Sequence, residues 1–196
     1  MPNLIRISIP LAFAALCTLA MPPGAQAQQQ QPAAQDEGYE QNEILQKATD
    51  FFGATTEGLA KAIEKVFSEQ GKPNAYVAGE EVSGAIGIGV RYGDGELNRK
   101  SGAPMKVYWQ GPSIGFDFGG NASKVFVLIY HLPDTESLFQ RFPAVDGSLY
   151  VVAGVGVNYQ QSGDIILAPI RTGVGLRAGV NIGYMHYTKT HSWIPL

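Results

Sequence analysis

The chain is poor in the residues that build cross-links and metal sites. Its 196 residues include one cysteine, Cys17, and three histidines. A single cysteine excludes an intramolecular disulfide, and no Cys/His set has the spacing of a zinc site. Charged residues make up only 16% of the chain and the formal net charge is −3, so the basic surface of a nucleic-acid-binding protein is missing. We therefore expect no metal, no other cofactor and no nucleic-acid partner.

Glycine, in contrast, is abundant. It accounts for 24 of the 196 residues, about one in eight, against a usual share of roughly 7%. Apolar residues still reach 45%, enough for a hydrophobic core, which excludes collagen and low-complexity disorder. Of the 24 glycines, 19 lie between Gly79 and Gly183. The excess therefore belongs to one region of the chain and needs a structural explanation there.

The N-terminus has the three parts of a secretory signal peptide. Arg6 is the only charged residue in this stretch, residues 7–19 are apolar, and residues 25–27 form an A-x-A cleavage motif. The apolar run is shorter than the roughly 18 residues that a membrane span needs. We predict that residues 1–27 are a signal peptide, that its cleavage removes Cys17, and that the exported chain does not span a membrane.

A tether and an amphipathic helix are predicted next. Residues 28–41 are rich in Gln, Ala and acidic side chains without apolar periodicity, which predicts a flexible tether. Across residues 42–72 apolar side chains recur at helical spacing, which predicts one helix with Asn42 as its N-cap. Gly53 and Gly58 weaken a helix interior, so we expect a break or a close packing contact near them. Acidic side chains balance the lysines on the polar face, which favours packing on the rest of the domain over a membrane surface.

Residues 73–196 change to a period of two. In stretches such as 86–91 and 149–158, one face is bulky and apolar while the other is Gly, Asn or Arg. Turn signals, including Gly-Asp-Gly at 93–95, divide the region into on the order of ten short strands. No second long helix can serve as a crossover, so the strands must be antiparallel. We predict a mainly β fold, a small soluble antiparallel β-barrel that forms one domain with the helix, with a short second helix allowed at 134–142.

Two glycine motifs match patterns for a catalytic serine and for dinucleotide binding, but neither is followed by the helix that these functions need. Residues 111–115 match the G-x-S-x-G nucleophile elbow with Ser113, yet the strand pattern continues where the elbow requires a helix. Residues 173–178 fit a loose dinucleotide fingerprint, and again no helix follows. We expect no catalytic residues and no enzymatic activity, with a serine hydrolase using Ser113 as an alternative.

Polar side chains within the strand pattern are the candidates for a ligand site. They are Glu80, Glu81, Arg91, Trp109, Asp117, Arg171 and Arg177. A charge within a strand must face water or find a partner, so an internal ion pair explains these residues as well as a ligand does. Trp109, Asp117, Arg171 and Arg177 are the ligand-binding candidates, and Trp109 could line a groove for a lipid or a glycan.

Several longer stretches resemble a known family. The most specific are Val107–Asp117, which contains Trp-Gln-Gly-Pro, and Pro169–Arg177, which contains Arg-x-Gly-Val-Gly-Leu-Arg. From about Asn42 to its C-terminus the chain resembles the EipA-type envelope integrity family of Gram-negative periplasmic proteins. The resemblance implies a soluble periplasmic barrel of short antiparallel strands that is required for envelope integrity under stress, without an established enzymatic activity or binding residues. The last strands also have a distant similarity to lipid-binding SYLF-type domains.

The resulting expectation is a non-enzymatic, monomeric periplasmic protein. It would maintain envelope integrity by binding an envelope lipid, a cell-wall component or a periplasmic protein. The alternative is an outer-membrane β-barrel, because eight strands of about 10 residues fit within the exported chain. Against it, Phe126–Tyr130 and Ile165–Leu167 are apolar on both faces, whereas a membrane-spanning strand alternates.

Overall fold

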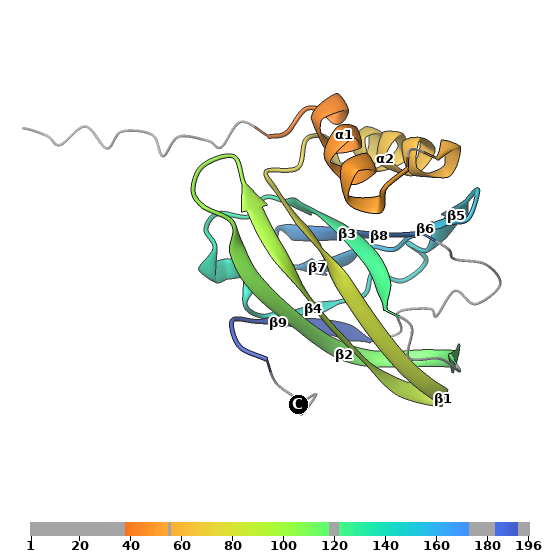
Figure 1. Cartoon of the computed structure of the whole chain (residues 1–196). Helices are drawn as coiled ribbons and strands as arrows, with labels where there is room; N and C mark the ends of the chain where they lie inside the picture. Colours follow the sequence, from red (N-terminus) through yellow and green to blue (C-terminus); the bar gives the residue numbers. More distant parts are fainter. Residues whose placement is uncertain (1–37, 55, 118–121, 173–182, 192–196) are drawn as a thin grey trace, which may run out of the picture. The chain divides into compact units, whose positions relative to one another are not determined.

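The computed structural model describes residues 38–54, 56–117, 122–172 and 183–191, all within one compact unit, Ala34–Leu196. Two helices, a short 3-10 helix (η1) and nine strands follow one another in the chain (Figure 1). They are α1 (Gln41–Phe52), α2 (Glu57–Gln70), β1 (Ala75–Arg99), β2 (Met105–Asp117), β3 (Ser123–Tyr130), η1 (Glu136–Leu138), β4 (Arg141–Pro143), β5 (Tyr150–Val152), β6 (Val155–Val157), β7 (Gln160–Ser162), β8 (Ile165–Thr172) and β9 (Tyr184–Thr188). The predicted mainly β fold is confirmed, whereas the predicted signal peptide lies outside the described residues.

All strand pairs of the sheet are antiparallel. The strand order is β4-β9-β2-β1-β3-β8-β6-β5, and β7 pairs with β8 beside β6. An isolated bridge between Ala144 and Gln160 links the end of β4 to β7. The amide of Val145 also donates to the carbonyl of Tyr159, 2.9 Å away. The sheet therefore curls until its β4 edge meets β7, which makes the fold barrel-like.

Strand β1 belongs to both halves of this barrel. Its first part, Ala75–Glu81, pairs with β3, and its second part, Ala85–Leu97, pairs with β2. Figure 1 shows the two parts as long ribbons that meet at the lower right. With 25 residues β1 is far longer than the short strands that we predicted, because the Gly-Asp-Gly stretch at 93–95 continues the strand instead of turning.

Glycine allows the two parts of β1 to touch through their backbones. A Cβ added to Gly95 would lie 2.5 Å from the carbonyl oxygen of Ala78, and one added to Gly79 would lie 2.6 Å from the Cα of Gly95. Contacts this short are incompatible with a side chain. Gly79 and Gly95 are therefore explained by the close approach of strands, which small curved sheets require.

The single predicted helix is in fact two. Glycine at position 53 has φ +84° and donates its N–H to Thr49, so it ends α1 in the left-handed conformation. The side chain of Thr56 then accepts the N–H of Leu59 and starts α2. Asn42 is not the N-cap: the N-cap is Glu40, two residues earlier, where Glu40 and Glu43 form a reciprocal capping box.

Gly58 marks a close packing contact of α2. A Cβ there would lie 2.6 Å from the carbonyl oxygen of Ala153 and 2.8 Å from that of Val152. The break and the close contact that the two helix glycines predicted are thus both present. Neither described helix combines the length and apolar character that a membrane crossing requires.

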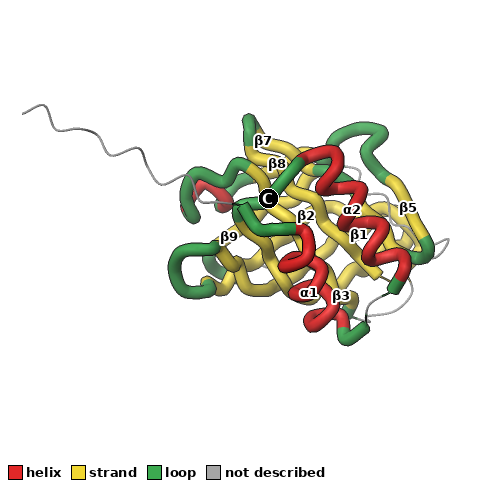
Figure 2. The backbone as a smooth tube through the Cα atoms, turned by 90° about the horizontal axis from the view of Figure 1, so that it is seen from above, coloured by secondary structure: helices red, strands yellow, loops and turns green. Residues whose placement is uncertain are grey.

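Two apolar cores lie on opposite faces of the sheet. The apolar sides of α1 and α2 pack on the outer face of β3, β6 and β8, with Ile44, Ile63 and Phe126 fully buried. Figure 2 shows both helices lying across the strands. The second core fills the barrel interior, around Trp109 and Phe142. Because both faces of β3 and β8 are covered, their sequences are apolar on both faces.

Candidate functional site

A layer of buried polar side chains borders the apolar core inside the barrel. We call it the Glu81 cluster; it consists of Glu81, Arg91, Trp109, Asn158 and Arg171. Glu81 and Arg91 are 4% and 5% exposed, and the side chain of Arg171 is 14% exposed. Charges buried to this extent are stable only when they are paired. The stability of this cluster therefore depends on how its charges are paired.

The strand register brings these residues onto the inner face of the barrel. Val125 of β3, which belongs to the interior core, pairs with Gly79 on one side and Arg171 on the other. Glu81 is two residues beyond Gly79, and residues two apart in a strand share a face. Trp109 reaches the same interior from β2. Segments far apart in the chain thus meet at one level of the barrel.

Glu81 is the centre of the cluster. Arg171 donates to both carboxylate oxygens, with 2.5 Å from Nε to Oε1 and 3.2 Å from Nη2 to Oε2. Nε of Arg91 lies 3.7 Å from Oε1, and the indole N–H of Trp109 lies 3.4 Å from Oε2. Burial alone would raise the pKa of Glu81, but the charges of Arg171 and Arg91 outweigh it and lower the pKa. Glu81 is therefore a carboxylate at neutral pH.

Asn158 holds the other side of the Arg171 guanidinium. Nη1 of Arg171 donates to Oδ1 of Asn158 at 3.0 Å. Asn158 is 7% exposed, and its Nδ2 has no hydrogen-bond partner within the described part of the chain. Buried polar atoms are normally paired, so this amide is an exception that calls for an explanation.

The structure brings together some of the predicted site residues. Trp109 and Arg171 both donate to Glu81, so the internal ion pair that sequence offered as the other explanation does exist. Arg177 and the side chain of Asp117 lie outside the described residues. Asn158 was not among the candidates. Its only signal in the sequence is its place on the polar face of the alternating stretch 149–158.

The motifs that suggested enzymatic chemistry gain no support from the described backbone. Strand β2 runs without interruption through residues 111–115, so the sharp turn of a nucleophile elbow is not formed there. The side chain of Ser113 and the glycine motif at 173–178 lie outside the described residues. Where the chain is described, no three His, Cys, Asp or Glu side chains come close enough to hold a metal ion.

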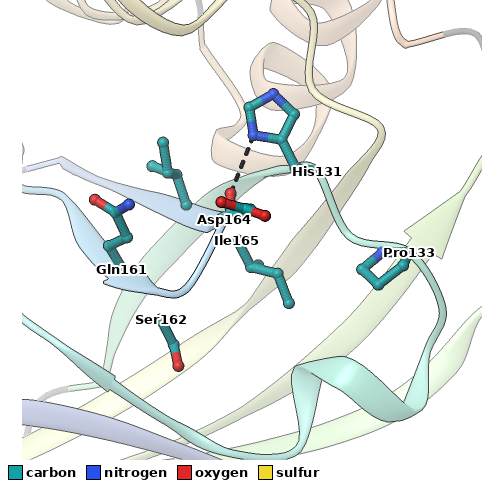
Figure 3. A pocket seen from close by; sticks show the side chains of 7 residues that line it. His131, Pro133, Gln161, Ser162, Asp164 and Ile165 are labelled. Carbon is teal, nitrogen blue, oxygen red and sulfur yellow. Dashed lines mark hydrogen bonds between the residues drawn. The ribbon is translucent and has the colours of Figure 1, made fainter.

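A separate surface groove lies at the other end of β8 from Arg171. Its volume is about 690 Å³, and its lining is His131, Pro133, Gln161, Ser162, Asp164, Ile165 and Ile166. His131 has a left-handed φ of 56°, and its Nδ1 lies 3.0 Å from the backbone oxygen of Asp164 (Figure 3). Ser162 points away from His131 in this view and donates to Oε1 of Gln140 instead. The groove therefore holds no serine–histidine pair.

Comparisons with known proteins agree with this architecture. The family model of Envelope integrity protein A (EipA) matches residues 37–196. A beta-barrel-like, uncharacterised protein from Brucella abortus has a similar crystal structure, with a TM-score of 0.75 and 46% sequence identity over 81% of this chain and 99% of that chain. No match was found among the curated proteins. Because the family match spans both helices and the whole described sheet, the chain belongs to the envelope integrity protein A family.

Proposed function

We propose that the protein is a non-enzymatic periplasmic protein that maintains envelope integrity by binding an envelope component at the Glu81 cluster. The observation that carries this proposal is the buried Glu81–Arg171 pair inside the barrel. A buried ion pair is seldom the most stabilising filling for a core, since apolar side chains of similar size often do as well or better. A guanidinium held rigidly and still 14% exposed is, however, well suited to binding.

The proposed periplasmic localisation is supported by the sequence and by the family. Residues 1–27 have the pattern of a secretory signal, and the family is one of envelope integrity proteins. Removal of this segment would also remove Cys17, leaving a chain without thiols, which suits an oxidising compartment.

The outer surface of the barrel favours a periplasmic protein over an outer-membrane barrel. The helices cover the outer face of β3, β6 and β8, which lipid would otherwise contact. On the outer face of β1 and β2, Glu96 pairs in register with Lys106, and Asp94 forms an ion pair with Lys106. A lipid-facing band would carry apolar side chains at these positions.

The proposal is tested in cells that lack the protein. We expect Arg171→Gln to fail to restore detergent resistance when it accumulates to the wild-type level, because the substitution removes the guanidinium from the barrel interior. Arg141→Gln is the matched control, since Arg141 lies exposed on the outer face of β4. Equal rescue by the two variants would contradict binding at the Glu81 cluster. Lipid and glycan analysis of the protein released by osmotic shock would then identify the bound component.

A further inference from the structure

We infer that Arg171 and Asn158 together form a site for an oxyanion, a carboxylate or phosphate group carried by the bound envelope component. This inference rests on the proposed function and specifies the chemistry of the ligand. It is drawn from the unused hydrogen-bond donors of the two side chains, which are joined to each other by a hydrogen bond in the barrel interior.

The orientation of the Asn158 amide is fixed by its neighbour. Arg171 is donor-only, so the atom 3.0 Å from its Nη1 must be the oxygen of Asn158 and not the nitrogen. The NH₂ group therefore projects from the opposite side of the amide. It has two N–H donors in a residue that is more than nine-tenths buried, and it has no partner among the described residues.

Arg171 also has donors to spare. Its three hydrogen bonds, two to Glu81 and one to Asn158, use three of the five N–H groups of a guanidinium. Glu81 and Asn158 hold the guanidinium from two sides, so little side-chain freedom remains to be lost when a ligand binds. Two N–H groups of the guanidinium and the NH₂ group of Asn158 therefore have no acceptor among the residues that the structure describes.

The described neighbours of the cluster on β1 and β3 include small residues. Ser123 is directly opposite Glu81 in the β1–β3 ladder, and it is exposed. Ser83 and Gly89, each two residues from a cluster member along β1, are partly exposed.

The donors select an anion rather than a cation or an apolar group. The guanidinium repels cations, and both it and the carboxamide NH₂ donate hydrogen bonds, whereas carboxylate and phosphate oxygens accept several hydrogen bonds at once. Both oxygens of Glu81 already accept from Arg171, and Trp109 shares Oε2, so the charge of Glu81 is engaged and not directed at the ligand. A single buried water on Asn158 is the competing occupant.

The test is a titration of the exported protein with inorganic phosphate and, separately, with acetate. The side-chain amide resonances of Asn158 are followed by ¹⁵N NMR, and the affinity is measured by calorimetry. We expect saturable shifts of the Asn158 NH₂ resonances with at least one anion. Asn158→Asp keeps an oxygen for Arg171 but replaces the NH₂ donor by a second oxygen, so it should weaken binding at least tenfold. Asn98→Asp makes the same change on a partly exposed asparagine whose Nδ2 already donates to the backbone oxygen of Glu96, and it should leave the affinity within twofold.

The inference is overturned if neither anion moves the Asn158 resonances, as a bound water alone would predict, or if the two Asp variants bind alike. Once one of the two anions has been shown to bind, a response to glycerol phosphate in solution indicates a soluble phosphate ester. A response to phosphatidylglycerol vesicles without a response to glycerol phosphate indicates a lipid headgroup. The proposed function is judged separately. If anions fail to bind but Arg171→Gln cells remain detergent-sensitive, the oxyanion site is wrong and the envelope role stands. If anions bind and those cells are fully resistant, the oxyanion site stands and the proposed envelope role of the Glu81 cluster is wrong.

Discussion

The indole of Trp109 occupies the space that a side chain on Gly93 would need. The two residues are directly opposite in the β1–β2 ladder, and a Cβ on Gly93 would overlap Nε1, Cε2 and Cζ2 of the ring. Trp109 is 2% exposed and lies 5.9 Å from the Tyr187 ring, so it cannot move aside. The glycine at position 93 and the tryptophan at 109 are thus one packing unit.

This packing unit predicts a strong coupling between the two positions. Gly93→Ala should destabilise the protein by about 1–3 kcal/mol, the usual range for overpacking a core. In a Trp109→Leu background the added methyl group has room, so the same change should cost much less. Urea denaturation of both single variants and the double variant measures the coupling. Additive free energies would show that the indole does not set the requirement for glycine.

Removal of the Glu81 charge should be costly and dependent on pH. Glu81→Gln leaves two guanidinium groups without their shared carboxylate, and we expect a loss of about 3–5 kcal/mol at pH 7. The folded-state pKa of Glu81 lies below its ordinary value of 4.5, so its stabilisation is complete above that value and disappears as the pH falls through the lowered pKa.

The stability difference between wild type and Glu81→Gln should therefore shrink below about pH 4.5. Chemical denaturation between pH 3 and pH 7, with midpoints compared at each pH, measures it. Glu96→Gln changes an exposed carboxylate on the same strand and should have little effect throughout. A difference that is constant with pH would contradict an ionised Glu81 in the folded state.

The contact at Gly58 predicts an effect opposite to helix propensity. Alanine is a better helix former than glycine by about 1 kcal/mol, yet its methyl group would meet the carbonyl oxygens of Val152 and Ala153. Gly58→Ala should therefore lower the thermal midpoint, because backbone atoms cannot move as a flexible side chain can. Gln46→Ala on the exposed side of α1 is the control and should leave the midpoint nearly unchanged. A higher midpoint for Gly58→Ala would mean that α2 does not rest on this turn.

The protonation of His186 should respond to Arg141. Burial, and to a smaller extent the positive charge of Arg141 on the neighbouring strand, lower the pKa of His186. Arg141→Gln removes only the second cause, so the pKa should rise part of the way toward the ordinary value of 6.5. A pH titration of the imidazole resonances by NMR measures this. Lys106→Gln removes a cation on β2 and should change the pKa of His186 less than Arg141→Gln does.

The class of fold could be predicted from local patterns. Alternation of apolar residues with Gly and polar residues predicted antiparallel strands, and helical spacing predicted the N-terminal helix with a disturbance near Gly53 and Gly58. The strand lengths could not be predicted, because the glycines at 93 and 95 have the local signature of a turn. Their real role depends on Trp109 and on the first part of β1, which sequence alone does not place.

The site was predicted only in part. Charges at Arg171 and Glu81 stand out within strand patterns, but they are 90 positions apart and their pairing follows from the register of three strands. Asn158 carries only a weak local signal, its place on the polar face of the alternating stretch 149–158, and an asparagine there is equally consistent with ordinary turn chemistry. Only the folded structure shows that Arg171 donates to the oxygen of Asn158 and that the buried NH₂ group has no partner among the described residues.

The bridge between Ala144 and Gln160 has a consequence for behaviour at high concentration. Because it joins the β4 edge to β7, β5 remains as the unpaired edge at its end of the strand order, and β5 has only three residues. Exposed strand edges are where folded β proteins add to one another and aggregate, and a very short edge offers few unpaired N–H and C=O groups. At this end the curled sheet thereby offers few groups for intermolecular strand addition.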